Sequence, residues 1–209
     1  MTTPFLTISA AAAGGFAGND AKNLVTSATW SMIGGAACTR NTHLSVPVFD
    51  LENPACYLQT REVEPYCDAS VGGFSTATWI DWRDSELGWR TLHRPTSDHI
   101  VLTQQNAKTL GCYAAGQFRS AGTTIDVDGW SLVISVATDD DCAADGGVNG
   151  TTKFYVGTPS STPVHVGSCD VASGAGRQTR FIGVSGRGPG KLAASWAWRH
   201  RLSDDDVVG

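Results

Sequence analysis

The chain has 209 residues, of which 41% are hydrophobic and 17% charged, and its formal net charge is −5. This length and composition are typical of one globular domain with a sizeable core, and they exclude an intrinsically disordered chain. The mild acidity excludes nucleic-acid binding, and the lack of an apolar run of roughly 18 residues excludes a membrane span but not docking on a membrane complex.

The first 30 residues differ from the rest in composition. The stretch "SAAAAGGFAGNDAKN" is made of small, weakly polar residues, which favours an extended arm over a packed element. The opening "MTTPFLTISAAAAGG" has no basic start and no adequate apolar core, so we do not expect it to be a signal peptide as it stands. We therefore predict an N-terminal arm over 1–30 and one domain over 31–209.

Short runs with strand character follow from residue 74 onward, separated by clusters of Gly, Ser, Thr, Asn and Asp at intervals of roughly 8 to 12 residues. In "GWSLVISVA", Trp130 and Ile134 lie on one face of the predicted strand, and Ser131 and Ser135 lie on the other. This alternation predicts that the Trp130 face is buried. Because helical periodicity is lacking, the sequence predicts an all-β sandwich or jelly roll. The predicted strands are 74–82, 89–94, 99–102, 109–114, 130–136, 153–157, 164–167 and 180–184.

The end of the chain combines a strand with a helix start. In "KLAASWAWRHRLSDDD", Leu192, Trp196 and Trp198 fall on one face of a predicted strand. Ser203 then stands where a helix N-cap belongs, and Asp206 follows at the spacing of a capping box, with Asp in place of Glu. The sequence therefore predicts a short C-terminal helical turn.

A series of motifs runs in order from about residue 70 to residue 209: "GFSTATWIDW", "GWRTLHRPTSDHIVL", "TLGCYAAGQFRSAG", "GWSLVISVA", "TTKFYVG", "VHVG" and "RFIGVSGRGPGKLAASWAWRHRLSDDDV". In this order they resemble the laminin G-like, or concanavalin A-like, jelly-roll family, and in particular such domains of marine unicellular algae. The resemblance implies an antiparallel two-sheet jelly-roll sandwich. The connection in "YVGTPSSTPVHVG" is longer than the Asp-Gly hairpin of many members, so no loop-borne site is carried over from the family.

Six cysteines are dispersed along the chain with no Cys-x-x-Cys pair, which argues against zinc ribbons and thioredoxin-type motifs. An even, dispersed set favours disulfides in an oxidising compartment, either extracellular or an organelle lumen, and the alternative is a set of buried thiols. We expect at least two disulfides, with Cys142–Cys169 and Cys56–Cys67 as the first choices. The disulfide candidates are Cys38, Cys56, Cys67, Cys112, Cys142 and Cys169.

The sequence offers no set of catalytic residues. The paired-carboxylate motif of glycoside hydrolases on this fold is missing, since Pro65 interrupts the acidic run at Glu62 and Glu64. "GVSGRG" fails as a nucleophile elbow, and "GRGPGKL" fails as a phosphate loop because its spacing is wrong and Pro189 removes a backbone donor. We expect a non-enzymatic protein and a turn at 186–192.

An acidic, Gly-rich loop lies between two predicted strands, over 138–153. Oxygen-rich loops of this kind hold calcium, but the spacing matches no calcium loop, so a solvated acidic loop is the main interpretation and calcium the alternative. The loop also contains the sequon at Asn149, which is glycosylated only in the secretory pathway. The possible calcium ligands are Asp139, Asp140, Asp141 and Asp145.

Most of the seven tryptophans lie inside strand patterns, where core packing is the simplest interpretation. Trp82 and Trp89 flank the "RDSELG" loop and are the best candidates for exposed, ligand-binding indoles. Together these features predict a non-catalytic recognition or assembly module, with protein subunits of a larger complex as partners and no required cofactor. The alternative is a carbohydrate-binding lectin, with calcium as a possible aid.

Overall fold

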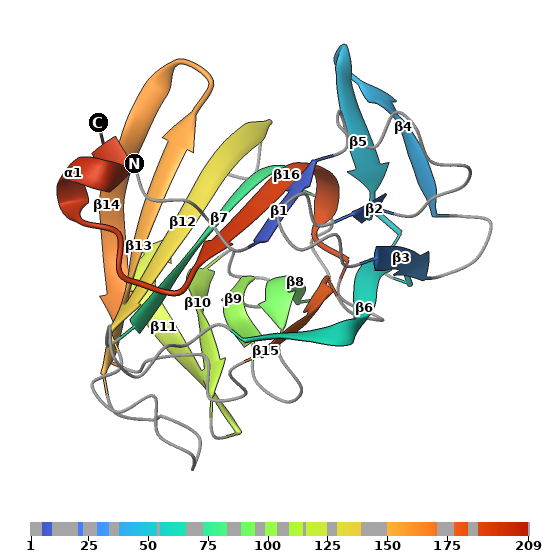
Figure 1. The fold of residues 1–209 in the computed structure, drawn as a ribbon. Helices are drawn as coiled ribbons and strands as arrows, with labels where there is room; N and C mark the ends of the chain where they lie inside the picture. The colour runs from blue at the N-terminus through green and yellow to red at the C-terminus, as the bar shows by residue number, and fades with distance from the viewer. Residues whose placement is uncertain are drawn as a thin grey trace.

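The structure, a computed structural model, describes residues 6–9, 21–22, 29–33, 38–53, 55–65, 73–82, 89–94, 99–103, 109–114, 116–124, 129–138, 150–170, 178–183 and 188–208. Over these residues the protein is an antiparallel two-sheet jelly-roll sandwich that ends in one short helix (Figure 1). The predicted fold class is therefore confirmed.

The first sheet contains eight of the described strands, with β7 near its centre. β16 pairs with β7 on one side, and on its other side with β5 and with the N-terminal strand β1 (Leu6–Ser9). From edge to edge the order is β14 (Ser161–Cys169), β13 (Thr151–Thr158), β12 (Trp130–Thr138), β7 (Gly73–Trp82), β16 (Gly190–Trp198), β5 (Val46–Asp50) and β4 (Thr39–His43).

The second sheet also contains eight of the described strands, and these are paired antiparallel throughout. From edge to edge the order is β11 (Gln117–Thr124), β10 (Thr109–Ala114), β9 (His99–Thr103), β8 (Arg90–Arg94), β15 (Gln178–Ile182), β6 (Tyr57–Pro65), β3 (Thr29–Ile33) and β2 (Ala21–Lys22).

All the strands predicted from residue 74 onward are present, with ends shifted by a few residues. Of the turn predicted at 186–192, residues 190–192 belong to β16, so that part of the prediction is wrong, and residues 186 and 187 lie outside the described residues. Of the predicted arm, the described residues 6–9 and 21–22 pair with β16 and β3. The boundary between an arm and a domain at residue 30 stays a prediction.

The apolar core fills the space between the two sheets. It combines inward side chains of the first sheet with those of the second, and all of them are almost fully inaccessible to solvent. Burial of this apolar surface is the main force that holds the sheets face to face. Large contributors are Phe49, Phe74, Phe154, Ile80, Leu92 and Leu192.

The predicted alternation in β12 is confirmed, and Ile134 and Val136 on the Trp130 face are buried, but this face does not meet the second sheet. Val133 and Ala137 point into the core between the sheets, whereas Ile134 and Val136 lie in a second apolar cluster on the outer face of the first sheet. Trp130 lies on this outer face and is half-buried. Both faces of β12 are poor in charge, so period-two alternation alone could not tell which face meets the second sheet.

A register shift in β16 corrects a second expectation. Leu192 pairs with Ile80 and faces the core, but the register shifts by one residue before Ala194 pairs with Trp79. A β-bulge of this kind moves every later side chain to the opposite face. The alternation predicted that Leu192 and Trp196 share a face, and this is wrong. Leu192 is in the core, and Trp196 packs on the outer cluster.

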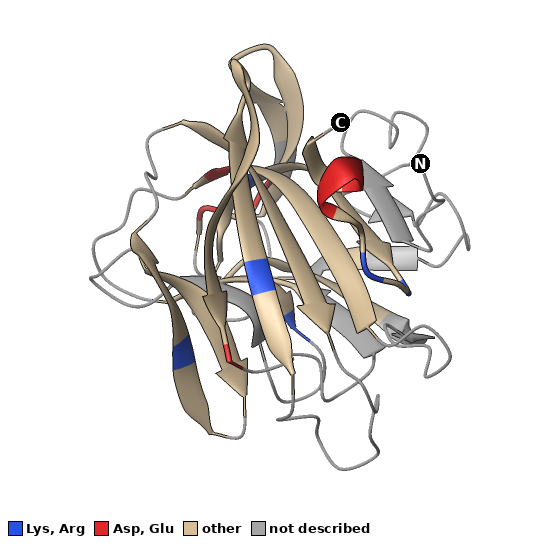
Figure 2. Cartoon of the chain, turned by 90° about the vertical axis from the view of Figure 1, so that its left-hand side faces the viewer, with Lys and Arg blue, Asp and Glu red and all other residues tan. Residues whose placement is uncertain are grey.

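The C-terminal capping box is confirmed. The backbone N–H of Asp206 donates to Ser203 Oγ over 3.1 Å, and the backbone N–H of Ser203 donates to Asp206 Oδ2 over 3.1 Å. These reciprocal bonds begin the helix α1 (Asp204–Val208), which buries Val207 against the outer cluster. Figure 2 shows α1 as an acidic element beside strands that carry few charges.

The cysteine pairing differs from the prediction. Cys38 and Cys56 form a disulfide, with a Cα–Cα distance of 5.5 Å, so the predicted Cys56–Cys67 bond is wrong. Cys169 carries a thiol, so the predicted Cys142–Cys169 bond is wrong as well. The fold brings Cys169 to Cys112, which lies 57 residues away in sequence, and loop length had not suggested this neighbour. Cys67 and Cys142 lie outside the described residues. The disulfide is consistent with an oxidising compartment.

A buried polar network crosses the sandwich. His93 Nε2, from the second sheet, lies 3.0 Å from Thr78 Oγ1 and 3.0 Å from Ser195 Oγ, both from the first. His93 and Ser195 are fully buried, so no substrate reaches this serine–histidine pair. Burial lowers the pKa of His93 to about 3, which leaves its imidazole neutral and too weak a base for catalysis at neutral pH.

Replacement of His93 tests this network through the pH dependence of folding. The pKa is lower in the folded state than in the unfolded chain, so the unfolded chain takes up the proton first as the pH falls. We expect the contribution of His93 to the free energy of unfolding to be complete above about pH 6.5. Below that pH it should fall by up to about 1.4 kcal/mol per pH unit. In chemical denaturation at pH values from 7 to 4, the free energy of unfolding of His93→Gln should therefore fall less steeply than that of the wild type. Equal pH slopes for the two proteins would contradict the assignment.

Candidate binding site

The two tryptophans predicted to be exposed occupy different environments. Trp82 is only 4% exposed and belongs to the core, so its predicted exposure is wrong. The reason is its register, because even-numbered positions of β7 face the second sheet. Trp89 is half-buried and packs edge-on against Phe118, with ring centroids 5.3 Å apart. The structure therefore does not bring these two side chains into one binding surface.

The acidic loop lies outside the described residues. This applies to the possible calcium ligands Asp139, Asp140, Asp141 and Asp145 and to the sequon at Asn149, all of which stay predictions. Among the described residues, no group of three or more His, Cys, Asp or Glu side chains is arranged to hold a metal ion.

The outer face of the first sheet carries most of the remaining chemistry. On β7 it presents Trp79 and Asp81, because these odd-numbered positions point away from the second sheet. Its middle is the outer cluster, defined by Ala77, Ile134, Val136, Tyr155 and Val207 with Leu132, Trp196, Trp198 and Leu202 packed against them. Two regions that combine apolar side chains with charged or polar ones lie beyond this cluster, one at each end of β12.

The first region is an indole cluster made of Trp79 and Trp130 with His43 and Asp81. The two indoles stack with ring centroids 6.3 Å apart and planes 15° apart. His43 Nε2 lies 2.5 Å from Asp81 Oδ2, and the His43 ring lies 6.1 Å from the Trp130 ring. His43 comes from the tip of the β4–β5 hairpin, whose turn residues Leu44 and Ser45 both have positive φ, as a tight type I′ turn requires.

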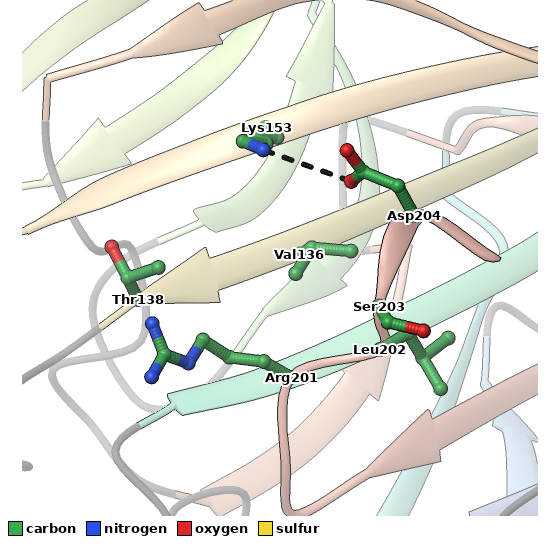
Figure 3. Close-up of a pocket in the computed structure, with 7 residues that line it drawn as sticks. All are labelled: Val136, Thr138, Lys153, Arg201, Leu202, Ser203 and Asp204. Carbon is green, nitrogen blue, oxygen red and sulfur yellow. Dashed lines mark ion pairs between the residues drawn. The ribbon is translucent and has the colours of Figure 1, made fainter. Parts of the chain in front are cut away.

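The second region is a pocket of about 350 Å³ at the opposite end of β12 (Figure 3). Trp130 and Thr138 are eight positions apart on this strand, so the two regions are separated by about 26 Å. Strands β12 and β13 form one wall of the pocket, and the segment between β16 and α1 forms the other. Its lining residues are Val136, Thr138, Lys153, Arg201, Leu202, Ser203 and Asp204.

Two cations and one carboxylate are the charged groups among the described residues that line the pocket. Lys153 Nζ lies 3.7 Å from Asp204 Oδ1, and both side chains are largely exposed. Arg201 extends toward Thr138 in Figure 3, and the described residues supply no hydrogen-bond acceptor or acidic partner for its guanidinium. The floor is apolar, from Val136 and Leu202.

A glycine sets the position of Arg201. The stem of Arg201 lies directly over Gly73, where a Cβ would come within 2.7 Å of Arg201 Cγ. Gly73 also has a φ of +150°, a value that other residues rarely adopt, and it pairs with Thr138 across the sheet. The guanidinium is therefore held beside the end of β12.

Several polar groups of the pocket are already engaged. Thr138 Oγ1 accepts from the backbone N–H of Thr151, and Ser203 Oγ caps α1. The Tyr155 hydroxyl donates to Asp204 Oδ1 over 2.6 Å. The groups that remain for a ligand are the Lys153 ammonium, the Arg201 guanidinium and the second oxygen of Asp204.

The Tyr155–Asp204 hydrogen bond shifts the pKa of both groups. Burial, and then the hydrogen bond and the charge of Asp204, raise the pKa of Tyr155 to about 12. The same hydrogen bond, with the charge of Lys153, lowers the pKa of the Asp204 carboxyl. Asp204 is therefore ionised at neutral pH and tied to β13, which fixes the pocket wall.

Sequence patterns gave no direct sign of this pocket. Lys153 stands in a predicted strand and Arg201 in a basic run before the helix, and they are 48 positions apart. They come to one pocket because β13 is in register with β12 and because Ser75 of β7 holds the segment around Arg201 on the sheet: its hydroxyl donates to the His200 carbonyl and accepts from the Leu202 backbone N–H. The basic run "RHR" next to an N-cap was the one available signal.

Comparison with known proteins supports the fold. The chain matches no known family model, and no curated protein is detectably similar in sequence. It resembles Trypanosoma rangeli sialidase in complex with the inhibitor DANA (TM-score 0.57, 10% identity, 99% of this chain and 32% of that one). It also resembles that sialidase in complex with sialic acid (TM-score 0.55, 10% identity, 97% and 31%).

A smaller structure is similar over most of its length. The Ruminococcus gnavus IT-sialidase CBM40 bound to alpha2,3 sialyllactose gives a TM-score of 0.45 and 13% identity over 73% of this chain and 94% of that one, which is too loose to support an argument. The chain spans about a third of the sialidases it resembles. The likeness to the two sialidase structures shows a β-sandwich fold, and no family model supports the narrower resemblance to laminin G-like domains.

The described part of the chain contains no helix of the length and apolar character needed to cross a membrane.

The pKa of Tyr155 tests the geometry of the pocket wall. We expect ultraviolet absorbance titration to show one tyrosine with a pKa near 12, and Tyr155→Phe to remove that signal. Asp204→Asn should lower this pKa, because the negative charge that opposes phenol ionisation is gone. An unchanged tyrosine titration in Asp204→Asn would show that the hydrogen bond does not form.

Calcium addition tests the acidic loop next to Thr138. We expect calcium to raise the Tm no more than sodium chloride of equal ionic strength does, because the ligand spacing is irregular and charge repulsion is relieved by salt alone. The double variant Asp140→Asn with Asp141→Asn should then respond as the wild type does. A single stoichiometric calcium site in titration calorimetry, lost in the variant, would contradict this expectation.

Proposed function

We propose that this chain is a non-catalytic carbohydrate-binding module and that the pocket between β12, β13 and residues 201–204 holds a sugar ring. The observation that carries the proposal is the pocket's combination of an apolar floor with cationic donors and a carboxylate acceptor. A sugar ring has apolar C–H faces that can pack on the floor of the pocket. Its hydroxyls both donate and accept hydrogen bonds, so they can pair with the cationic donors and with the carboxylate. The volume, about 350 Å³, lies within the usual range for small-ligand sites.

The charge of the pocket favours an acidic sugar over a neutral one. Among the described lining residues, Arg201 and Lys153 contribute two positive charges against the single negative charge of Asp204. Guanidinium pairs with a carboxylate through two parallel hydrogen bonds, the strongest neutral-pH contact available to this lining. We therefore place a ligand carboxylate at Arg201 and ligand hydroxyls at Lys153 and Asp204.

The structural neighbours are compatible with this proposal. One of them is the structure of Trypanosoma rangeli sialidase in complex with sialic acid, which is an acidic sugar. Part of that sialidase shares the sandwich fold with almost the whole of this chain. The likeness covers about a third of that enzyme, so the proposal for this chain rests on its own pocket.

Protein assembly, the main expectation from the sequence, has less support. A docking surface for a protein partner normally presents a contiguous apolar patch. Among the described residues, the exposed large hydrophobic side chains are Ile33 in β3, Leu44 in the β4–β5 turn, Val164 in β14 and Val208 in α1, and of these elements β14 and α1 contact each other. Carbohydrate recognition is therefore the better proposal.

A glycan array and affinity measurements test the proposal. We expect binding to glycans with a terminal carboxylated sugar and weaker binding to their neutral counterparts. Arg201→Ala should raise the Kd by about tenfold or more, the usual effect of losing a charge-assisted hydrogen bond. Arg119→Ala is the matched control, because Arg119 is an exposed arginine on β11 of the second sheet and its loss changes the net charge equally.

Two outcomes would contradict this placement. If Arg201→Ala and Arg119→Ala weaken binding equally, the effect is one of net charge and not of a pocket. If Trp79→Ala abolishes binding while Arg201→Ala does not, the ligand lies on the indole cluster at the other end of β12. Failure of all glycans to bind would remove the carbohydrate proposal altogether.

A further inference from the structure

The thiols of Cys112 and Cys169 lie next to each other inside the sandwich, at the side opposite the Cys38–Cys56 disulfide. Cys112 lies in β10, and Cys169 is the last residue of β14. Their Sγ atoms are 3.4 Å apart, and both side chains are almost fully buried. A disulfide needs a separation of about 2.05 Å, so a shift of about 1.4 Å, within reach of small rotations about the two Cα–Cβ bonds, would join them.

The local packing holds this pair together. Cys169 Sγ also donates to the carbonyl oxygen of Arg119, 3.2 Å away in β11. β11 approaches closely because two glycines make room for it: a Cβ at Gly111 would collide with the Arg119 carbonyl, and one at Gly167 would collide with the Ala121 carbonyl. Strands β10, β11 and β14 therefore converge on the two sulfur atoms.

The two cysteine pairs occupy opposite sides of the sandwich. Cys38 precedes β4, at one edge of the first sheet, and its disulfide joins it to Cys56, which precedes β6 of the second sheet. Cys169 ends β14, at the other edge of the first sheet, and faces Cys112 beside the edge strand of the second. The Cys38–Cys56 bond joins the two sheets at one side, and Cys112 and Cys169 bring side chains of the two sheets together at the other.

We propose that Cys112 and Cys169 form a second disulfide when the chain folds in an oxidising compartment, so that both open sides of the sandwich are cross-linked. This inference is independent of the proposed function. The Cys38–Cys56 bond shows that the same chain is compatible with such a compartment.

The chemistry is a thiol–disulfide exchange with glutathione disulfide or the disulfide of an oxidoreductase. The thiolate of one cysteine attacks the external disulfide, which forms a mixed disulfide and releases one thiol. The second cysteine, as its thiolate, then attacks the mixed disulfide and releases the other external thiol. Two protein thiols lose two electrons and two protons, and the external disulfide is reduced to two thiols. Because both sulfurs are buried in the finished fold, the exchange takes place before packing is complete.

Alkylation after oxidative refolding tests the proposal. The protein is unfolded and reduced, refolded in a glutathione redox buffer, denatured again and treated with N-ethylmaleimide, and its peptides are mapped by mass spectrometry. We expect one linked peptide pair that contains Cys38 and Cys56 and another that contains Cys112 and Cys169. Removal of the second cross-link, which closes a loop of 57 residues, should lower the Tm by about 10 °C.

Single variants supply the controls, since thiol counting in denaturant does not depend on their stability. Cys112→Ala should make Cys169 available to the alkylating reagent, and Cys169→Ala should do so for Cys112. Cys38→Ala should leave the Cys112–Cys169 link intact and free only Cys56. The proposal is overturned if Cys112 and Cys169 are both alkylated in a sample that retains the Cys38–Cys56 link, or if either of them is linked to Cys67 or Cys142.

Discussion

The antiparallel register of β7 with its neighbours β12 and β16 is the constraint on which the rest of the structure depends. Side chains alternate along a strand, so this one register sends Thr78 and Ile80 toward the second sheet and Trp79 and Asp81 outward. The register shift in β16 then changes which side chains of that strand face the second sheet. Leu192, before the shift, enters the core, and Trp196, after it, packs on the outer face. The core, the indole cluster and the pocket all follow from these pairings.

The first sheet is apolar on both faces, and this explains the role of the C-terminal segment. Its inner face is covered by the second sheet, and its outer cluster by Leu202 and Val207. Without that cover, Ile134 and Val136 would be exposed, at a cost set by the apolar area involved. The hydroxyl of Ser75 holds the segment at Leu202 on the sheet, and the capping box begins the helix that carries Val207. The pocket lies at the margin of this cover, where Lys153 and Asp204 meet.

Specific links between the sheets supplement the apolar core. The His93 network joins β8 to β7 and β16 through neutral groups, so it satisfies buried hydroxyls without placing a charge in the interior. The Cys38–Cys56 disulfide joins the sheets at one side. At the opposite side, Gly111 and Gly167 permit the close approach of β11 to β10 and β14. The sheets therefore have one relative position, and the side chains of the pocket have fixed supports.

The sequence by itself determined the fold class, the described strands from β7 onward apart from β11, and the capping box, because alternation and cap spacing are local signals that survive any tertiary arrangement. It did not predict β11 or any of the strands β1 to β6, and in β4 and β11 the polar, exposed residues lack that alternation. Only the tertiary structure decided which face of β12 meets the second sheet, why Trp82 is buried, and that Cys56 bonds Cys38. It also brought Lys153 to Arg201. These outcomes depend on register and on contacts between residues far apart in the chain, and a local pattern carries no information about either.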